Sequence, residues 1–101
     1  MDRTELIPPT DEGLSTLADF FRVFADETRI RILCELLEGE KRVLDIANCL
    51  GLSHSAVSHQ LQLLRARRIV AFRKEGKNVC YSIADDRIFS ILRQGIEHVE
   101  K

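Results

Sequence analysis

Apolar residues recur every three or four positions through most of the chain, which is the spacing of one face of an α-helix. The first such stripe runs over residues 14–24 and predicts a helix that begins near Gly13 or Leu14. The dozen residues before it contain two prolines and few apolar side chains. We therefore expect residues 1–12 to form a flexible N-terminal arm and residues 13–101 to form one domain.

Two further helices are bounded by residues that favour helix ends. Asp26 can cap the second helix by accepting a hydrogen bond from the amide of Arg29, and the apolar stripe of this helix stops before Gly39. The third helix is short, covers residues 43–50 and ends at Gly51. Glycine is favoured there because it readily adopts the left-handed conformation that ends a helix.

A fourth helix begins directly after the third, and its two sides differ in chemistry. Ser53 can cap it, and Val57, Leu61 and Leu64 recur on its inward side. The opposite side carries short polar side chains: His54, Ser55, Ser58, His59 and Gln62. Donors and acceptors of this size can reach base edges from a helix that lies in the roughly 12 Å wide major groove of DNA. The pattern predicts a helix-turn-helix whose second helix reads bases.

Beyond the fourth helix the apolar period changes from 3.6 to 2, which is typical of β-strands. Residues 70–73 and 79–83 alternate in this way, and the four residues 75–78 between them have the chemistry of a hairpin loop. Asp85 or Asp86 then begins a last helix. The expected fold is mainly α with one β-hairpin, in the order α-α-α-α-β-β-α, which is a winged helix-turn-helix.

The composition is that of an ordinary globular protein. Of the 101 residues, 45% are hydrophobic and 31% are charged, and this length supports one hydrophobic core. No apolar run approaches the roughly 18 residues that a membrane span needs, and the N-terminus lacks the apolar stretch of a signal peptide. We therefore expect a cytoplasmic protein without a membrane partner.

The net charge of −1 conceals an uneven distribution along the chain. Residues 1–40 carry four basic and ten acidic side chains, whereas residues 41–78 carry eight basic and two acidic ones. A positive middle segment indicates contact with a polyanion, and a solvated basic face is the alternative. The basic residues expected to contact DNA phosphates are Arg65, Arg67 and Arg68 at the end of the fourth helix and Arg73, Lys74 and Lys77 in the hairpin.

Several stretches of this sequence resemble the ArsR/SmtB family of small bacterial transcriptional repressors. The matching strings are FADETRIRIL in the second helix, DIANCLGLSHSAVSHQLQLLRARRIV across the helix-turn-helix, and RKEGKNVCYSI in the hairpin. The resemblance covers about residues 14–101. It implies a homodimer formed through the first and last helices, which binds a (pseudo)palindromic double-stranded DNA operator and is released by an effector.

The same resemblance implies two places for a metal effector, and both are incomplete. The family's zinc site joins the last helices of the two protomers, and its positions fall on Asp85, Arg87, His98 and Lys101. Because Arg87 and Lys101 are cations, which offer zinc no lone pair, only Asp85 and His98 remain as a candidate zinc-binding pair. At the family's cysteine site in the third helix, Arg42 stands in the place of the cysteine. Zinc is therefore the one cofactor that the sequence leaves as a candidate.

The three cysteines offer a second kind of effector site. Cys34 lies on the apolar stripe of the second helix and Cys49 near the end of the third, so both are expected to be buried. Cys80 alternates with Val79 and Tyr81, so its thiol is expected to face away from them, among basic neighbours that favour a reactive thiolate. A redox or persulfide switch at Cys80, with Cys49 or Cys34, is the alternative to a metal sensor.

Two other classes of function fit the sequence less well. No nucleophile elbow, phosphate loop or His-Glu-x-x-His string occurs, and His54 and His59 do not share a helix face, so an enzyme is not expected. A winged-helix module that binds only other proteins is the remaining alternative. A steep fall of DNA affinity with salt would favour the DNA-binding protein over both.

Overall fold

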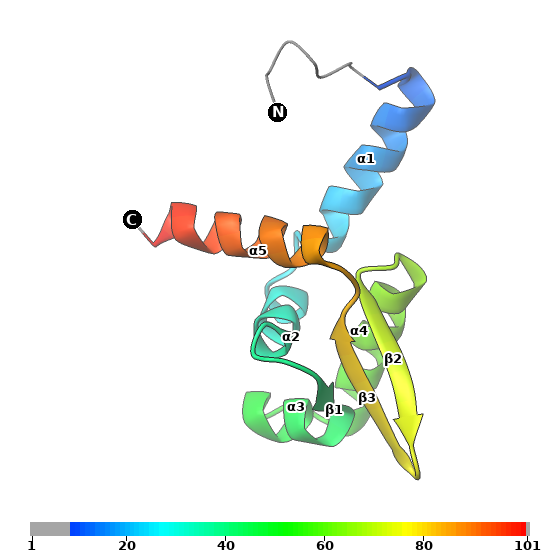
Figure 1. The fold of residues 1–101 in the computed structure, drawn as a ribbon, viewed down its shortest axis with the longest axis vertical. Coiled ribbons are helices and arrows are strands. Elements are labelled where there is room, and N and C mark those ends of the chain that lie inside the picture. The colour runs from blue at the N-terminus through cyan, green and yellow to red at the C-terminus, as the bar shows by residue number, and fades with distance from the viewer. Residues whose placement is uncertain (1–8, 101) are drawn as a thin grey trace.

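The computed structural model describes residues 9–100, which form five helices and three strands (Figure 1). The helices, in chain order, are α1 (Asp11–Val23), α2 (Glu27–Leu36), α3 (Val43–Leu50), α4 (His54–Ala66) and α5 (Asp86–Val99). The strands are β1 (Lys41–Arg42), β2 (Val70–Glu75) and β3 (Asn78–Ile83). The winged helix-turn-helix expected from the sequence is confirmed, with β1 as an addition.

The additional strand joins the start of α3 to the hairpin. In β1, Lys41 lies opposite Tyr81 and Arg42 opposite Cys80, so the three antiparallel strands have the order β1-β3-β2. A strand of two residues is too short to show an alternating pattern, and its hydrogen-bond partner lies far along the chain. For these reasons the sequence pattern did not predict it.

The hairpin has a tighter turn than the four-residue loop that the sequence predicts. Glu75 and Asn78 are paired with each other at the ends of β2 and β3, which leaves only Gly76 and Lys77 in the turn. Gly76 has a φ of 62°, a conformation that two-residue hairpin turns require and that glycine adopts without strain. Lys77 therefore lies at the tip of the hairpin.

The helix ends follow the local chemistry of the chain. Asp26 accepts a hydrogen bond from the Arg29 amide (3.0 Å), and Ser53 accepts one from the Ala56 amide (3.1 Å), as the sequence predicts. Gly51 ends α3 with a φ of 67°. The predicted starts of α2 and α4 and the predicted end of α3 are therefore confirmed.

The first helix begins slightly earlier than the sequence predicts. The hydroxyl of Thr10 accepts a hydrogen bond from the Gly13 amide (3.1 Å), so α1 begins at Asp11. Asp11 and Glu12, assigned to the N-terminal arm from the sequence, thus belong to the helix, where acidic side chains suit the first turn. The rest of the expected arm, apart from residues 9 and 10, lies outside the described residues.

The hydrophobic core lies between α2, α3, α4 and the hairpin. The inward side predicted for α4 is confirmed, because Val57, Leu61 and Leu64 are fully buried. They pack with side chains such as Ile32 of α2 and Ile46 of α3. Burying a side chain of this kind stabilises the fold by about 1.5–3 kcal/mol.

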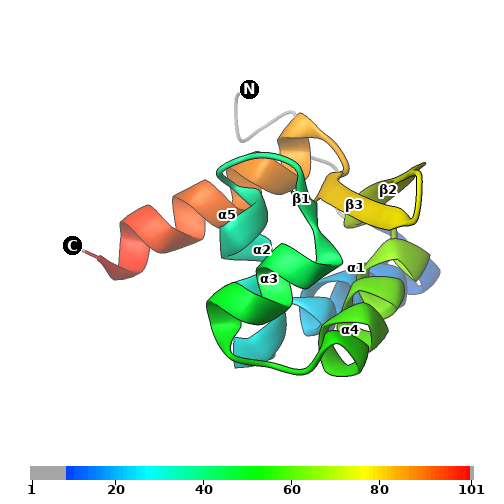
Figure 2. The ribbon, with the colours of Figure 1, turned by 90° about the horizontal axis from the view of Figure 1, so that it is seen from below.

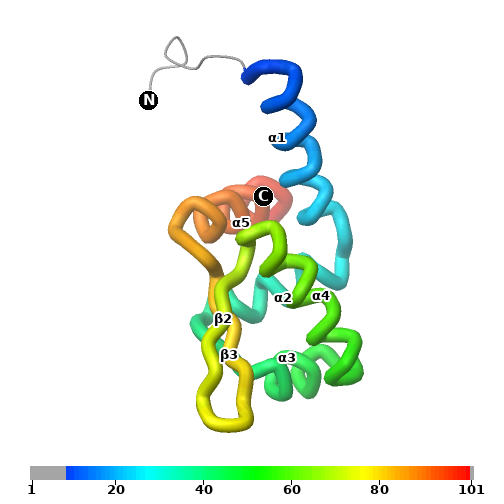
Figure 3. Tube along the Cα trace, turned by 90° about the vertical axis from the view of Figure 1, so that its right-hand side faces the viewer, coloured from blue at the N-terminus to red at the C-terminus, as the bar shows by residue number. Residues whose placement is uncertain are grey.

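Helices α1 and α5 are less enclosed than the rest of the molecule. Helix α1 has no buried residue and rises away from the body of the molecule (Figures 1 and 3). Seen from below, α4 and the hairpin lie on one side of the molecule, while the C-terminal end of α5 extends on the other (Figure 2). Among residues 9–100, no helix is long and apolar enough to cross a membrane.

Candidate nucleic-acid interface

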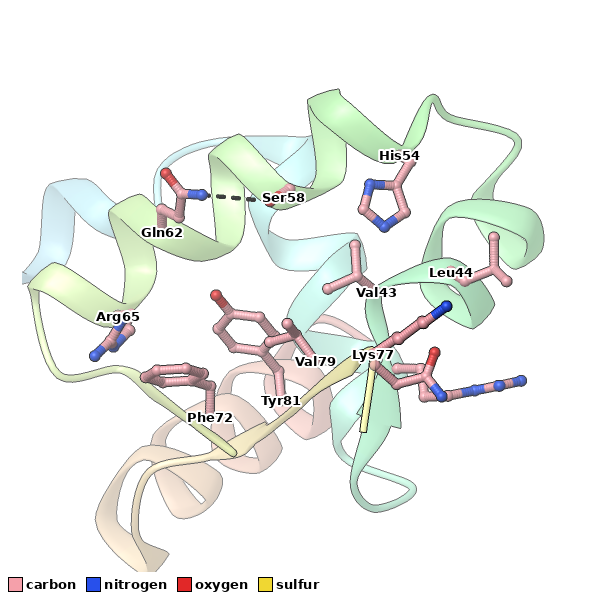
Figure 4. Close-up of a pocket in the computed structure, with 12 residues that line it drawn as sticks. Val43, Leu44, His54, Ser58, Gln62, Arg65, Phe72, Lys77, Val79 and Tyr81 are labelled. Atoms are coloured by element: carbon pink, nitrogen blue, oxygen red, sulfur yellow. Dashed lines mark hydrogen bonds between the residues drawn. The ribbon is translucent and has the colours of Figure 1, made fainter. Parts of the chain in front are cut away.

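The polar side of α4 and the hairpin border an open cleft of about 290 Å³, which we call the α4–hairpin cleft (Figure 4). Five of the eleven residues expected to contact DNA line it: His54, Ser58, Gln62, Arg65 and Lys77. The remaining six do not line this cleft: Ser55, His59, Arg67, Arg68, Arg73 and Lys74. The cleft is thus lined both by residues expected to read bases and by residues expected to bind phosphates.

The polar side of α4 is open to an approaching ligand. His54, Ser55, His59 and Gln62 are exposed, and Ser58 is half-buried. The Gln62 amide donates a hydrogen bond to the Ser58 hydroxyl across one helical turn (3.4 Å). Since the opposite side of α4 is fixed in the core, these polar groups are held outward on a rigid element, as base readout from a major groove requires.

The end of α4 is tied to the hairpin by a cation–π contact. The guanidinium carbon of Arg65 lies 3.6 Å from the centre of the Phe72 ring. Phe72 in turn pairs with Tyr81 across the two strands, with 5.9 Å between the ring centres. A contact of this kind is worth about 0.5–1 kcal/mol at an exposed site. It holds Arg65 at the edge of the cleft.

Arg73, a predicted phosphate contact, already has two carboxylate partners. Its guanidinium donates to both oxygens of Glu40 (2.8 and 2.7 Å) and forms an ion pair with Glu75 (2.7 Å). The hydrogen bond from Arg73 holds the pKa of the Glu40 carboxyl below its usual range. The two carboxylates compensate the charge of Arg73, which leaves less of it to attract a phosphate.

A second pocket, on the other face of the hairpin, is lined by Arg73 and by further paired charges. Lys41 lies 3.1 Å from a carboxylate oxygen of Glu35, and Arg42 makes two hydrogen bonds to Asp45 (2.9 and 3.0 Å). We call this region the ion-paired pocket. It is lined by four carboxylates, three cations and two thiols: Glu35, Glu40, Asp45, Glu75, Lys41, Arg42, Arg73, Cys49 and Cys80.

The cysteines are placed differently from one another. Cys49 is exposed and Cys34 half-buried, so the expectation that both are buried is wrong. Cys49 falls outside the buried face of α3, and its hydrogen bond to Glu35 raises the pKa of its thiol, which disfavours a reactive thiolate. Cys80 is buried and lines the ion-paired pocket, while Val79 and Tyr81 line the α4–hairpin cleft, so it does face away from them.

The candidate zinc-binding pair is poorly suited to a metal ion. One carboxylate oxygen of Asp85 accepts from the amides of Arg87 (2.9 Å) and Ile88 (3.1 Å), and the other lies 3.2 Å from the Arg87 guanidinium. These hydrogen bonds, the Ile88 amide foremost, hold the pKa of Asp85 below its usual range. His98 lies thirteen residues further along, roughly 20 Å at the rise of an α-helix. Lys101 lies outside the described residues.

The ligand set therefore does not fit zinc. A cation already occupies the free side of the Asp85 carboxylate, and Arg87 itself offers zinc no lone pair. At this distance, His98 could join Asp85 at one ion only from a second copy of the chain. In the region that the structure describes, no group of three or more His, Cys, Asp or Glu side chains could hold a metal.

Seven of the residues that line the α4–hairpin cleft were not predicted to belong to the site, and three of these carry an aromatic ring or an amide. These three are Phe72 and Tyr81, which lie opposite each other in the hairpin, and Asn78 at its turn. The strand alternation assigns Phe72 and Tyr81 to the inward face, which normally indicates a core position. Only the packing of the hairpin against α4 shows that this face also borders a cleft.

Comparisons with known proteins agree with this geometry. Residues 26–71 match the family described as "Bacterial regulatory protein, arsR family". A cadmium resistance transcriptional regulatory protein CadC homolog from Staphylococcus aureus is 39% identical over 81% of this chain and 69% of its own length. The chain belongs to the ArsR family. This confirms the family resemblance drawn from the sequence.

A second ArsR-family relative is longer than this chain. The transcriptional repressor SmtB homolog from Synechocystis is 40% identical over 84% of this chain, and the match spans 64% of that repressor. The chain therefore covers somewhat less than two thirds of this relative.

Solved structures show the same ArsR-family fold. The AntR antimony-specific transcriptional repressor has a TM-score of 0.84 and 31% identity, with 99% of this chain and 93% of that chain covered. The homodimeric winged helix-turn-helix domain of Mb0332 from Mycobacterium bovis has a TM-score of 0.83 and 26% identity, with 94% and 91% covered.

Proposed function

We propose that this ArsR-family protein is a transcriptional repressor that binds double-stranded operator DNA as a homodimer and leaves it when an effector binds. The observation that carries the proposal is the charge of the α4–hairpin cleft. Among the described residues, its lining contains Arg42, Arg65, Lys77 and His54 but no carboxylate. Such a cleft beside an outward-facing polar helix suits a ligand that presents base edges and phosphates together.

The proposed roles divide the surface into two kinds of contact. Polar residues of α4 read bases. They are His54, Ser55, Ser58, His59 and Gln62. Arg65, Lys74 and Lys77 bind phosphates, since none of them has a carboxylate partner among the described residues. Arg73 is proposed to stabilise the hairpin through Glu40 instead of contacting phosphate.

The unpartnered apolar faces of α1 and α5 support a homodimer. Leu14, Leu17 and Phe21 of α1 are each about half exposed, and Val99 of α5 is 76% exposed. A folded single chain rarely leaves so many large apolar side chains on two neighbouring helices. We therefore propose that a second copy covers them, and that the dimer's two-fold axis matches a palindromic operator.

A substitution in α1 tests the dimer. Phe21→Asp places a charge in the proposed interface and is expected to convert the protein to a monomer in sedimentation experiments. The folded circular dichroism spectrum should persist, because Phe21 is not part of the core. A variant that stays dimeric would place the interface elsewhere.

The nature of the effector is a separate question. The relatives named after cadmium resistance and antimony point to metals, whereas Asp85 and His98 of this chain are poorly arranged for zinc. One equivalent of zinc is expected to change DNA affinity by less than twofold. A tenfold weakening, about 1.4 kcal/mol of coupling free energy, would show that the metal site functions after all.

A thiol switch is the alternative effector mechanism. Cys49 and Cys80 line the same ion-paired pocket, and Cys49 is exposed to oxidants, whereas Cys34 does not line that pocket. Mild peroxide treatment that oxidises Cys49 or Cys80 without changing the affinity for DNA would exclude this mechanism. A repressor of this kind would act in the cytoplasm, where bacterial DNA lies.

The function itself is tested with reduced protein and two fluorescent duplexes. One duplex carries the sequence upstream of the protein's own gene, and the other carries the same bases in scrambled order. Fluorescence anisotropy should show at least a hundredfold tighter binding to the first. Binding to neither duplex would contradict the repressor and favour a winged-helix module that binds other proteins.

A further inference from the structure

Tyr81 is an unusual constituent of the α4–hairpin cleft. It is only 4% exposed, yet Figure 4 shows that its side chain points from β3 toward α4 and the cleft. Within residues 9–100 its hydroxyl makes no hydrogen bond, while Gln62 and Ser58 are bonded to each other. The residue as a whole is buried, but its hydroxyl is not among the fully buried side-chain atoms that lack a partner, so it is open to the cleft. The hydroxyl therefore has room for a ligand that enters the cleft.

The surroundings of Tyr81 select the charge of that ligand. Within residues 9–100, the cleft lining includes no aspartate or glutamate. Two cations at its rim, Arg65 and Lys77, have no carboxylate partner in the described part of the chain, whereas Arg42 is compensated by Asp45. The phenol and the two free cations are hydrogen-bond donors, and no anionic acceptor competes for them. Such a donor set suits an anion with several acceptor oxygens.

We propose that the α4–hairpin cleft binds one phosphate group and that the Tyr81 hydroxyl donates a hydrogen bond to it. Arg65, held against the ring of Phe72, keeps the plane of its guanidinium fixed beside the phosphate, and Lys77 adds a second charge from the hairpin tip. This inference rests on the proposed function, because a DNA strand that contacts both α4 and the hairpin must pass over this cleft. The shared chemistry is a tetrahedral oxyanion, supplied either by the DNA backbone or by a free phosphate.

Tyr81→Phe tests the hydrogen bond with little disturbance of the core. The variant keeps the ring that packs on Phe72 and removes only the hydroxyl. Affinity for both the upstream duplex and the scrambled duplex should fall by the same factor, about tenfold, because a phosphate contact carries no sequence information. Since no charge is lost, the slope of log affinity against log salt should stay unchanged.

A matched control lies one residue further along the same strand. Ser82→Ala also removes one hydroxyl from β3, but Ser82 lies on the other side of the strand and does not line the cleft. It should bind both duplexes as the wild type does. Thermal midpoints of both variants, read by circular dichroism, should stay within a few degrees of the wild type.

The outcomes separate this inference from the proposed function. If the wild type binds DNA and Tyr81→Phe binds equally well, the phosphate site is overturned while the repressor stands. If Tyr81→Phe lowers affinity for the upstream duplex alone, the hydroxyl reads a base and the phosphate site is likewise overturned. If the wild type binds no duplex, the proposed function fails first.

Inorganic phosphate distinguishes the two sources of the oxyanion. Sodium phosphate is added to the protein–DNA complex, with sodium chloride of equal ionic strength as the reference. Displacement of DNA beyond the chloride reference, lost in Tyr81→Phe, would identify free phosphate as an occupant of this site. Displacement equal to chloride, together with the tenfold effect of Tyr81→Phe, identifies the DNA backbone as its occupant.

Discussion

The α4–hairpin cleft and the ion-paired pocket lie on opposite faces of the same hairpin, and their charges are organised in opposite ways. In the cleft, Arg65 and Lys77 stand without carboxylate partners among the described residues. In the pocket, Arg73 is held by Glu40 and Glu75 at hydrogen-bond distance. Phe72 and Arg73 of β2 show how one strand serves both regions: Phe72 lines the cleft and Arg73 lines the pocket, because successive side chains of a strand point to opposite faces.

The comparison shows that a count of basic residues overestimates the charge available to DNA. Of the eight basic residues in positions 41–78, three are paired with carboxylates: Lys41, Arg42 and Arg73. The other five have no such partner within residues 9–100: Arg65, Arg67, Arg68, Lys74 and Lys77. The five unpaired cations lie at the end of α4, in the segment that follows it and in the hairpin, and they are the ones expected to determine DNA affinity.

A carboxylate introduced into the cleft should have the largest effect. Ser58→Glu places a negative charge on the half-buried face of α4, where phosphates are expected to approach and where the lining has no other carboxylate. We expect the affinity for DNA to fall by more than about a hundredfold, since like charges at close range cost several kcal/mol. The oligomeric state and the thermal midpoint should change little.

Ala71→Glu is the matched control for this substitution. It adds the same charge to β2, at an exposed position that does not line the cleft. Its DNA affinity should fall by less than about fivefold, as expected for a surface charge at a distance. If Ser58→Glu binds DNA as tightly as Ala71→Glu does, α4 does not face the groove.

Removing one unpaired and one paired cation should give unequal effects. Lys77→Gln should weaken DNA binding several-fold and reduce the salt slope by about one per protomer, because a phosphate contact is lost. Arg73→Gln should leave the salt slope unchanged and change affinity by less than about twofold. Equal salt slopes and equal affinities for the two variants in anisotropy titrations would contradict the difference proposed between the α4–hairpin cleft and the ion-paired pocket.

The smallest expected effect concerns the pH dependence of stability. The pKa of Glu40 is lowered in the folded protein by its hydrogen bond with Arg73, so the pair stabilises the fold when the carboxylate is ionised. The stabilisation of the fold by this pair is fully present above about pH 5, and it is lost as the pH falls through the pKa of Glu40 in the folded protein.

Glu40→Gln removes that contribution. The thermal midpoint of the variant should lie slightly below the wild type at pH 7, and the two should converge as the pH is lowered to about 3. A difference that stays constant from pH 7 to pH 3 would show that the ion pair with Arg73 does not stabilise the protein.

Local features of this fold could be predicted from the sequence, because they depend on residues only a few positions apart. The caps at Asp26 and Ser53, the end of α3 at Gly51, and the inward side of α4 all follow from short-range chemistry. That five of the candidate residues would lie close together could be predicted for the same reason, since most lie on one side of one helix.

Features that depend on distant segments could not be predicted in this way. Glu40 and Arg73 are 33 residues apart, so no local pattern shows that the cation is already paired. The strand β1 and the exposure of Cys49 depend likewise on how α3 packs against the sheet and α2. The alternation places Tyr81 on the same face of the strand as Val79, and its position beside a cleft is visible only when α4 and the hairpin are seen together.

The most direct test of the central claim is the salt dependence of DNA binding by the wild-type protein. Fluorescence anisotropy on the upstream duplex, between 50 and 300 mM salt (roughly the range where phosphate contacts dominate), gives the slope of log affinity against log salt. With several of the five unpaired cations of each protomer on phosphates, the dimer should show a slope of about −5 or steeper. A slope near zero, or no binding at the lowest salt, would contradict the account.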